Sequence, residues 1–156
     1  MATAITVRQF LDQRHLPYEV VAHRRTSTSL QAAKAAMIAP RHLAKAVLLE
    51  EDGQYLMVIL PTARHIRLGE LRHQFKRDFG LATERAVTSI FQDCIPGAVP
   101  AVGPAYGLDT IWDDSLMSGS ELYFEAGDHE HLICMRTDDY LGLLRGCPHG
   151  AFSESV

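Results

Sequence analysis

The 156-residue sequence has few cysteines and no long apolar run. Its three cysteines, Cys94, Cys134 and Cys147, are odd in number and widely spaced, which argues against a disulfide framework. No stretch approaches the roughly 18 consecutive apolar residues that a membrane-spanning helix needs. The first residues, MATAITVRQFLDQ, lack the charged and then apolar pattern of a secretory signal. We therefore expect a cytoplasmic protein with reduced thiols and no membrane partner.

The common catalytic and cofactor motifs are also missing. The sequence has no GxSxG nucleophile elbow, no HExxH, no GxxxxGK[ST] phosphate loop and no GxGxxG fingerprint. None of the cysteines has a neighbour that suggests a nucleophile. We expect no cofactor and no metal, and an enzyme of this sequence would have to act largely by positioning and electrostatics.

The composition fits one globular domain whose charge is unevenly distributed. With 47% hydrophobic and 22% charged residues, a chain of this length can bury a core unaided. Residues 1–85 hold 13 lysines and arginines against 8 acidic residues, a net charge of +5. Residues 86–156 hold 2 against 11, a net charge of −9. The basic half could contact nucleic-acid phosphates, although the overall charge of −4 argues against tight, indiscriminate binding.

Hydrophobic periodicity predicts a mixture of helices and strands. Helices are expected over 6–15, 29–37, 66–79, 87–91 and 137–144, the last capped by Thr137, and strands over 18–22, 44–51, 54–61, 108–112, 121–126 and 131–136. Asp52 and Gly53 suit a type I′ turn between the second and third strands. This order predicts an α/β (α+β) fold, a single compact domain over 1–145 with a mixed, barrel-like β-sheet flanked by helices, and a frayed tail over 146–156.

Two features, Lys45 and the segment 94–107, could carry chemistry. Lys45 opens an apolar strand, so its ammonium either reaches solvent or is held in a pocket as a fixed cation for a phosphate, a carbonyl or an oxyanion. The segment 94–107 contains three prolines and three glycines, which excludes regular structure. Its part from Gly97 to Pro100, continuing to Gly103, is either a tight connection or a loop that binds a substrate through its backbone.

Two further candidates lie in the acidic half. Asp113 either caps a turn with Asp114 and Ser115 or recognises an amino group. His129 and His131 alternate, which would place them on one face of a strand at a spacing compatible with two metal ligands. No third or fourth ligand is evident nearby, so a single histidine that orients a substrate, or a solvated turn histidine, is the preferred interpretation.

The ordered set of these segments resembles the YbaK and prolyl-tRNA-synthetase-associated editing-domain family of aminoacyl-tRNA deacylases. The resemblance spans roughly residues 5–145 and rests on four stretches: TSTSLQAAKAAMIAPRHLAKAVLLEEDGQYLMVILP, PGAVPAVGPAYG, IWDDSL and FEAGDHEHLICM. It implies a pocket between Lys45 and the loop at Gly97, and hydrolysis of the ester that links a wrongly chosen amino acid to a tRNA. The implied catalytic residues are Lys45, Gly97 and His129, and the implied substrate contacts are Ser27, Ala98, Val99, Pro100, Gly103, Asp113 and His131.

The loop departs from the common family pattern at Ala101 and by placing Gly103 and Pro104 before Tyr106 and Gly107. Ala101 stands where many members have a second proline, so the resemblance leaves the accepted amino acid open among small residues such as alanine, cysteine and serine. The implied partner is the acceptor end of a mischarged tRNA, with an aminoacyl-tRNA synthetase as a second candidate. The alternative function is a non-catalytic module of the same fold that binds an aminoacyl-nucleotide or small ligand.

Overall fold

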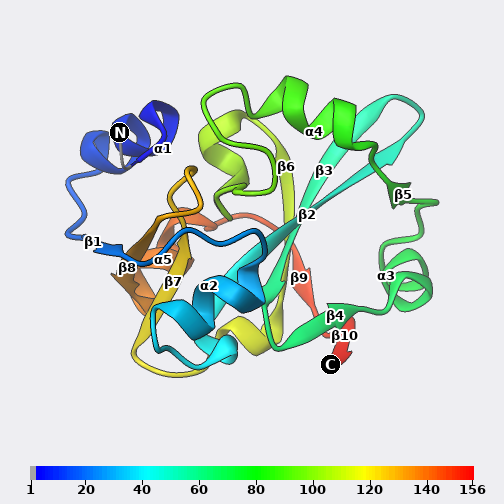
Figure 1. The fold of residues 1–156 in the computed structure, drawn as a ribbon. Coiled ribbons are helices and arrows are strands. Elements are labelled where there is room, and N and C mark those ends of the chain that lie inside the picture. The colour runs from blue at the N-terminus through cyan, green and yellow to red at the C-terminus, as the bar shows by residue number, and fades with distance from the viewer. Residues whose placement is uncertain (1–2) are drawn as a thin grey trace.

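The hairpin around Asp52 and Gly53 lies at the centre of the sheet (Figure 1). In this computed structural model, which describes residues 3–156, strands β2 (Leu43–Glu51) and β3 (Gln54–Pro61) pair antiparallel, with Glu51 opposite Gln54. Asp52 has a φ of +50° and Gly53 of +79°. Both values are positive, as a type I′ turn requires, so the predicted hairpin is confirmed.

Around this hairpin the chain builds a large mixed sheet in the order β1-β8-β7-β2-β3-β6-β9, with β5 paired to β2. The further strands are β1 (Glu19–Ala22), β5 (Gly80–Leu81), β6 (Asp109–Asp113), β7 (Glu121–Glu125), β8 (His131–Arg136) and β9 (His149–Gly150). The pairs β2–β7, β3–β6 and β6–β9 are parallel and the others are antiparallel. The α/β fold with a mixed sheet flanked by helices is thereby confirmed. Since β1 and β9 end the order without pairing to each other, the hydrogen-bonded sheet is open along that seam.

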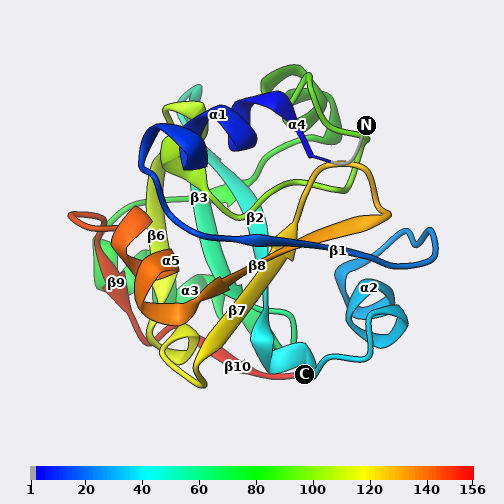
Figure 2. The same ribbon diagram turned by 90° about the vertical axis from the view of Figure 1, so that its left-hand side faces the viewer.

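Helices cover both faces of the sheet. They are α1 (Ile5–Gln13), α2 (Ser29–Ala35), α3 (Leu68–Phe75), α4 (Glu84–Ile90) and α5 (Thr137–Leu143), with short 3-10 turns over Pro40–His42, Gly103–Tyr106 and Asp114–Leu116. Figure 2 shows α2 and α5 on opposite sides of β7 and β8. Successive residues of β7 explain this arrangement, because Tyr123 packs with the α2 cluster whereas Phe124 packs against Tyr140 of α5. No helix in residues 3–156 is long and apolar enough to span a membrane.

The predicted helix over 66–79 is shorter than expected. Ile66 belongs to a separate strand, β4 (Arg64–Ile66), and the helix ends where Lys76 adopts a φ of +53°. Ile66 and Phe79, which flank the helix, pack with the same core cluster as the helix. The helical spacing of apolar residues in the sequence therefore continues beyond the residues that form the helix. Thr137 is also not the cap of α5: Arg136 occupies that position, and the Thr137 hydroxyl donates to the Gly119 carbonyl oxygen.

The prediction of a frayed tail over 146–156 is wrong. β9 adds to the edge of the main sheet beside β6, and β10 (Ser153–Ser155) pairs with β4. Between them Phe152 is fully buried, edge-on to the Phe75 ring. The buried Phe152 ring and the two short strand pairings therefore hold residues 146–156 against the rest of the domain, although this segment contains few apolar residues.

Candidate active site

The loop over residues 94–107 is tied to the turn between β7 and β8. The Ile95 N–H donates to the Gly127 carbonyl oxygen at 2.8 Å, and the Pro96 carbonyl oxygen lies 2.7 Å from His129 Nε2. Deeper in the loop, the Tyr140 hydroxyl donates to the Ala101 carbonyl oxygen. The position of Gly97 is therefore set from outside the loop as well as by its prolines.

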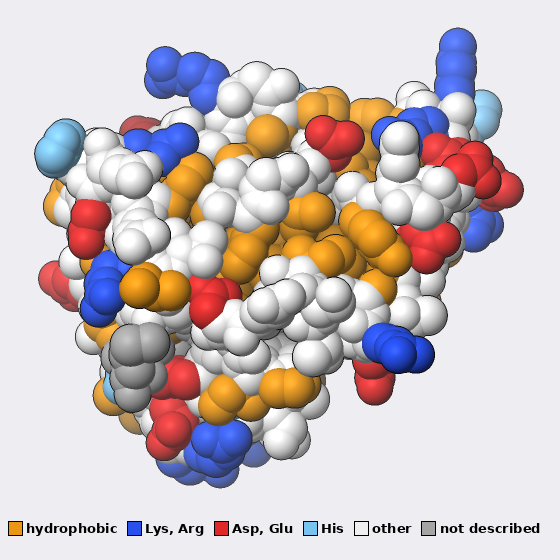
Figure 3. Space-filling view, turned by 90° about the horizontal axis from the view of Figure 1, so that it is seen from above, with side chains coloured by type: hydrophobic (Ala, Val, Ile, Leu, Met, Phe, Trp, Pro, Cys, Tyr) orange, Lys and Arg blue, Asp and Glu red, His pale blue; other side chains and the backbone are white. Residues whose placement is uncertain are grey.

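Gly97 lies at a partly enclosed cavity of about 180 Å³. Residues of β2, β3, α2, α4 and the loop line it: Ser29, Ala46, Leu48, Met57, Val87, Phe91, Gly97 and Val99. A second cavity of about 280 Å³ shares Val87 and Gly97 and is completed by Glu84, Thr88 and Pro96. Viewed from above, apolar side chains gather in the middle of the face that carries this part of the molecule, with charged side chains around the rim (Figure 3). Taken alone, the cavity of about 180 Å³ is smaller than the roughly 300–1,000 Å³ typical of pockets for drug-sized ligands, so its volume suits a small group.

Several residues predicted from the sequence surround this cavity. Gly97 and Val99 line it, while Ala98 and Pro100 are buried within the loop. The Ser27 side chain is exposed, but its carbonyl oxygen would lie 3.8 Å from a Cβ placed on Gly97. The predicted loop and the segment leading into α2 therefore meet at Gly97.

Lys45 lies on β2 directly before Ala46 but is not itself among the residues that line the cavity, because successive side chains of a strand point to opposite faces. Its side chain is half-buried, and no ion pair or hydrogen bond to it is formed within residues 3–156. Burial lowers the pKa of the Lys45 ammonium from its usual value, because a charge is costly to desolvate. A half-buried ammonium of this kind is available for an anionic or carbonyl oxygen of a ligand.

The two histidines do not share a strand face, contrary to the sequence prediction. His129 is in the turn with a φ of +63°, and its side chain is buried beside the loop. His131 begins β8, and its Nδ1 lies 2.6 Å from Asp128 Oδ2. Within residues 3–156, no three side chains of histidine, cysteine, aspartate or glutamate come together as a metal site would require.

Glu125 is a residue of this site that the sequence analysis did not identify. It ends β7, its side chain is 2% exposed, and its Oε2 lies 3.7 Å from His129 Nδ1. Burial, with a smaller contribution from the charge of Asp128, raises the pKa of the Glu125 carboxyl to about 7. The signal in the sequence is an acidic residue at the end of an apolar strand, Leu-Tyr-Phe-Glu-Ala, directly before the glycine turn.

Asp113 and Gly103 lie away from the cavity, where Asp113 accepts hydrogen bonds and Gly103 permits close packing. The Asp113 carboxylate is buried and accepts hydrogen bonds from the Phe152 N–H, the Ser153 hydroxyl, and both the N–H and the hydroxyl of Ser115. These bonds outweigh desolvation and lower its pKa. A Cβ on Gly103 would come within 2.0 Å of Thr110 Oγ1, so glycine is needed there for close packing. Neither residue lines the cavity at Gly97, and the expectation that they contact substrate does not fit their surroundings.

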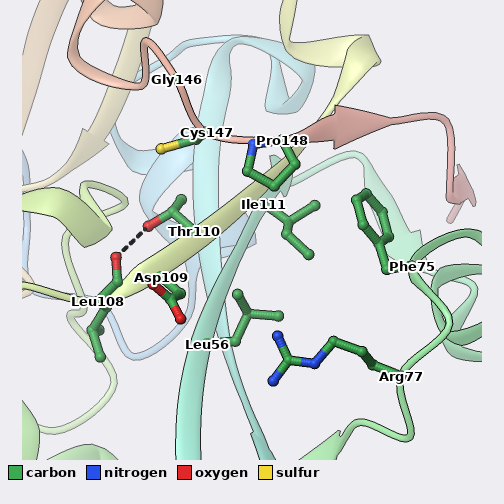
Figure 4. Close-up of a pocket in the computed structure, with 10 residues that line it drawn as sticks. All are labelled: Leu56, Phe75, Arg77, Leu108, Asp109, Thr110, Ile111, Gly146, Cys147 and Pro148. Atoms are coloured by element: carbon green, nitrogen blue, oxygen red, sulfur yellow. Dashed lines mark hydrogen bonds between the residues drawn. The ribbon is translucent and has the colours of Figure 1, made fainter.

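A larger cavity of about 390 Å³ lies elsewhere, between β6, the end of α3 and the C-terminal segment (Figure 4). Its lining includes Leu56, Phe75, Arg77, Asp109 and Cys147. None of the predicted site residues lines it, and burial raises the pKa of the Cys147 thiol, which disfavours a reactive thiolate. The site at Gly97 therefore remains the candidate.

Comparison with solved structures supports the fold. A candidate trans-editing enzyme for prolyl-tRNA synthetase superposes with a TM-score of 0.81 at 21% identity, covering 97% of each chain. A hypothetical protein gives a TM-score of 0.81 at 18% identity, covering 96% of this chain and 99% of the other. A candidate signal transduction protein from Marinobacter aquaeolei VT8 gives 0.76 at 21% identity, covering 96% of this chain and 30% of that protein.

Comparison at the level of sequence identifies the family. No curated protein matches the chain. The profile of the aminoacyl-tRNA editing domain matches residues 23–143, which include Ser27, Lys45, Gly97 and His129. This match extends over most of the chain and over the whole site at Gly97. The chain therefore belongs to the aminoacyl-tRNA editing domain family.

Proposed function

We propose that this protein is a trans-acting aminoacyl-tRNA deacylase that hydrolyses the ester of a mischarged tRNA carrying a small amino acid. The observation that carries the proposal is the partly enclosed cavity of about 180 Å³ beside Gly97, in a chain of the editing-domain family. Alanine, cysteine and serine are the candidate amino acids, and proline tRNA is the candidate carrier. The enzyme acts in the cytoplasm, alone or beside an aminoacyl-tRNA synthetase.

The proposed mechanism needs no side-chain nucleophile. An aminoacyl ester is already activated, so a positioned water and stabilisation of charge on the carbonyl oxygen are enough. The backbone at Gly97 positions the ester, and the Lys45 ammonium holds a carbonyl or phosphate oxygen by its charge. The apolar wall formed by Leu48, Met57 and Phe91 excludes large amino acids. Exclusion by size suits an editing reaction, because binding alone discriminates one methylene by only about 1–3 kcal/mol.

The experiment compares Lys45→Ala with a matched control, Lys76→Ala, on proline tRNA charged with alanine. Lys76 is an exposed lysine at the end of α3, outside the cavity lining. We expect Lys45→Ala to lower kcat/KM about 100-fold, the scale of losing one charge-stabilising group, with an unchanged circular dichroism spectrum. Lys76→Ala should retain the wild-type rate. Full activity of Lys45→Ala on a substrate that the wild type hydrolyses would refute the assigned role.

A further inference from the structure

Glu125 is a buried carboxyl group without a hydrogen-bond partner. Its side chain is 2% exposed, and within residues 3–156 neither carboxyl oxygen takes part in a hydrogen bond. Burying such a group without a partner costs free energy that an apolar side chain would not cost. The polar atom that it faces is His129 Nδ1, at 3.7 Å, which is itself buried and without a hydrogen-bond partner in the described chain.

The contact made by Nε2, the other ring nitrogen of His129, shows that this nitrogen is protonated. Its Nε2 lies 2.7 Å from the Pro96 carbonyl oxygen, and a carbonyl only accepts hydrogen bonds. Nε2 must therefore carry a hydrogen. Nδ1 then presents either a lone pair toward a protonated Glu125 or an N–H toward an ionised Glu125. The two groups are 3.7 Å apart, an ion-pair rather than a hydrogen-bond distance, and in both cases Nε2–H stays directed at Pro96.

The Pro96 carbonyl belongs to the peptide that leads into Gly97. Because a peptide unit is planar, fixing its carbonyl also fixes the direction of the Gly97 N–H. No backbone carbonyl within residues 3–156 accepts that N–H. The His129 ring also packs closely on Gly97, since a Cβ added there would lie 3.2 Å from Nε2. Gly97 itself has a φ of +87°, a conformation that a side chain would strain.

We propose that Glu125 is a positioning residue that holds His129 in the orientation and protonation state that fix the Pro96–Gly97 peptide at the cavity. The inference rests on the proposed function for its kinetic consequence, because the peptide matters for activity only if the ester binds there. Its structural part, the control of the His129 ring by Glu125, stands independently.

The test uses two variants of Glu125 with a matched control on the same strand. Glu125→Gln keeps the shape and offers an amide N–H to Nδ1, whereas Glu125→Leu keeps the bulk and removes the partner. Glu121→Leu changes an exposed glutamate at the opposite end of β7. With alanine-charged proline tRNA, Glu125→Leu should lower kcat at least tenfold and change KM less than threefold. Glu125→Gln should stay within threefold of the wild-type kcat, and Glu121→Leu should match the wild type.

A double variant separates action through His129 from independent action. In a His129→Ala background, Glu125→Leu should lower kcat less than twofold further, because its route of action is already gone. Two losses that multiply would overturn the proposal, as would a folded Glu125→Leu protein with the kcat of the wild type.

A measurement without substrate keeps this proposal distinct from the function. Long-range ¹H–¹⁵N spectra of the histidine rings report which nitrogen of His129 is protonated. We expect Nε2–H in the wild type and in Glu125→Gln, and a mixture of tautomers in Glu125→Leu. An unchanged His129 ring in Glu125→Leu would overturn the inference even if deacylation is observed. Loss of the Nε2–H state would support it even if no tRNA is hydrolysed, in which case only the proposed function fails.

Discussion

Glu125 carries a carboxyl group in a place where its neighbours Phe124 and Ala126 are fully buried. Burial raises its pKa from 4.5 to about 7. Between these values the native protein holds a proton that the unfolded chain has released. The free energy of unfolding therefore decreases as pH rises through this interval, because the native state binds more protons than the unfolded state.

Replacing this carboxyl with an amide should remove that pH dependence. We expect the wild type to lose about 3 kcal/mol of unfolding free energy relative to Glu125→Gln between pH 4.5 and 7.5. Urea unfolding of both proteins at the two pH values measures the difference. Both proteins carry the same other titrating groups, so the contributions of these groups cancel when the two unfolding free energies are subtracted. The same change of unfolding free energy with pH in both proteins would contradict a raised pKa of Glu125.

At the scale of residues, the sequence predicts backbone features better than side-chain partners. The glycines and prolines around Gly97 identify the loop because their local conformational limits are encoded in the residues themselves. The alternation of His129 and His131 predicts a strand position for His129, whereas His129 lies in the turn with a φ of +63°. Glu125 and Asp113 could not be assigned from the sequence, since what each one faces depends on chain segments distant in sequence.

Among the elements, the C-terminal segment shows how distant contacts determine structure. Phe152 fills a cluster that includes Leu71, Phe79 and Ile111, and the Asp113 carboxylate accepts its N–H at 3.0 Å. Local sequence predicts only a polar tail because these partners come from α3, β6 and the chain near β5. The central hairpin, by contrast, is predicted correctly, since its turn residues and both strands are adjacent in sequence.

Truncating Phe152 tests the role of this segment. Phe152→Ala should lower the free energy of unfolding by about 3–5 kcal/mol, the usual cost of removing a buried aromatic ring. The deacylation kcat at 15 °C should remain within twofold of the wild type, because the segment does not line the cavity at Gly97. Chemical denaturation and the tRNA assay give the two values, with Ser155→Ala as a control. A loss of less than 1 kcal/mol would contradict docking of the segment.

At the scale of the whole molecule, the basic half is not uniformly available to a polyanion. Three arginines around α3 pair with acidic residues: Arg67 with Glu154, Arg72 with Asp78 and Arg77 with Glu51. Around α2, Arg25 forms an ion pair with Glu130. Within residues 3–156, the other cations near this helix take part in no ion pair: Arg24, Lys34 and Arg41. The surface near α2, rather than the whole basic half, is therefore suited to phosphates.

Neutralising two of these cations should weaken tRNA binding in a salt-dependent way. We expect Arg24→Gln with Lys34→Gln to reduce the slope of log affinity against log salt by about 1–2, as loss of one or two phosphate contacts requires. The matched control is Arg136→Gln with Arg145→Gln, which removes the same charge from the acidic half. Filter binding of uncharged proline tRNA over a salt series measures both. Equal slopes for the two double variants would refute the surface assigned to tRNA.

The most direct test of the central claim is the rate of deacylation across a panel of tRNAs charged with amino acids of different size. The small cavity at Gly97 predicts hydrolysis of alanyl, seryl or cysteinyl esters, with kcat/KM at least tenfold above that for leucyl and phenylalanyl esters. The same rates are expected with and without a chelator. No hydrolysis of any small ester, or equal hydrolysis of small and large ones, would contradict a size-selective editing enzyme.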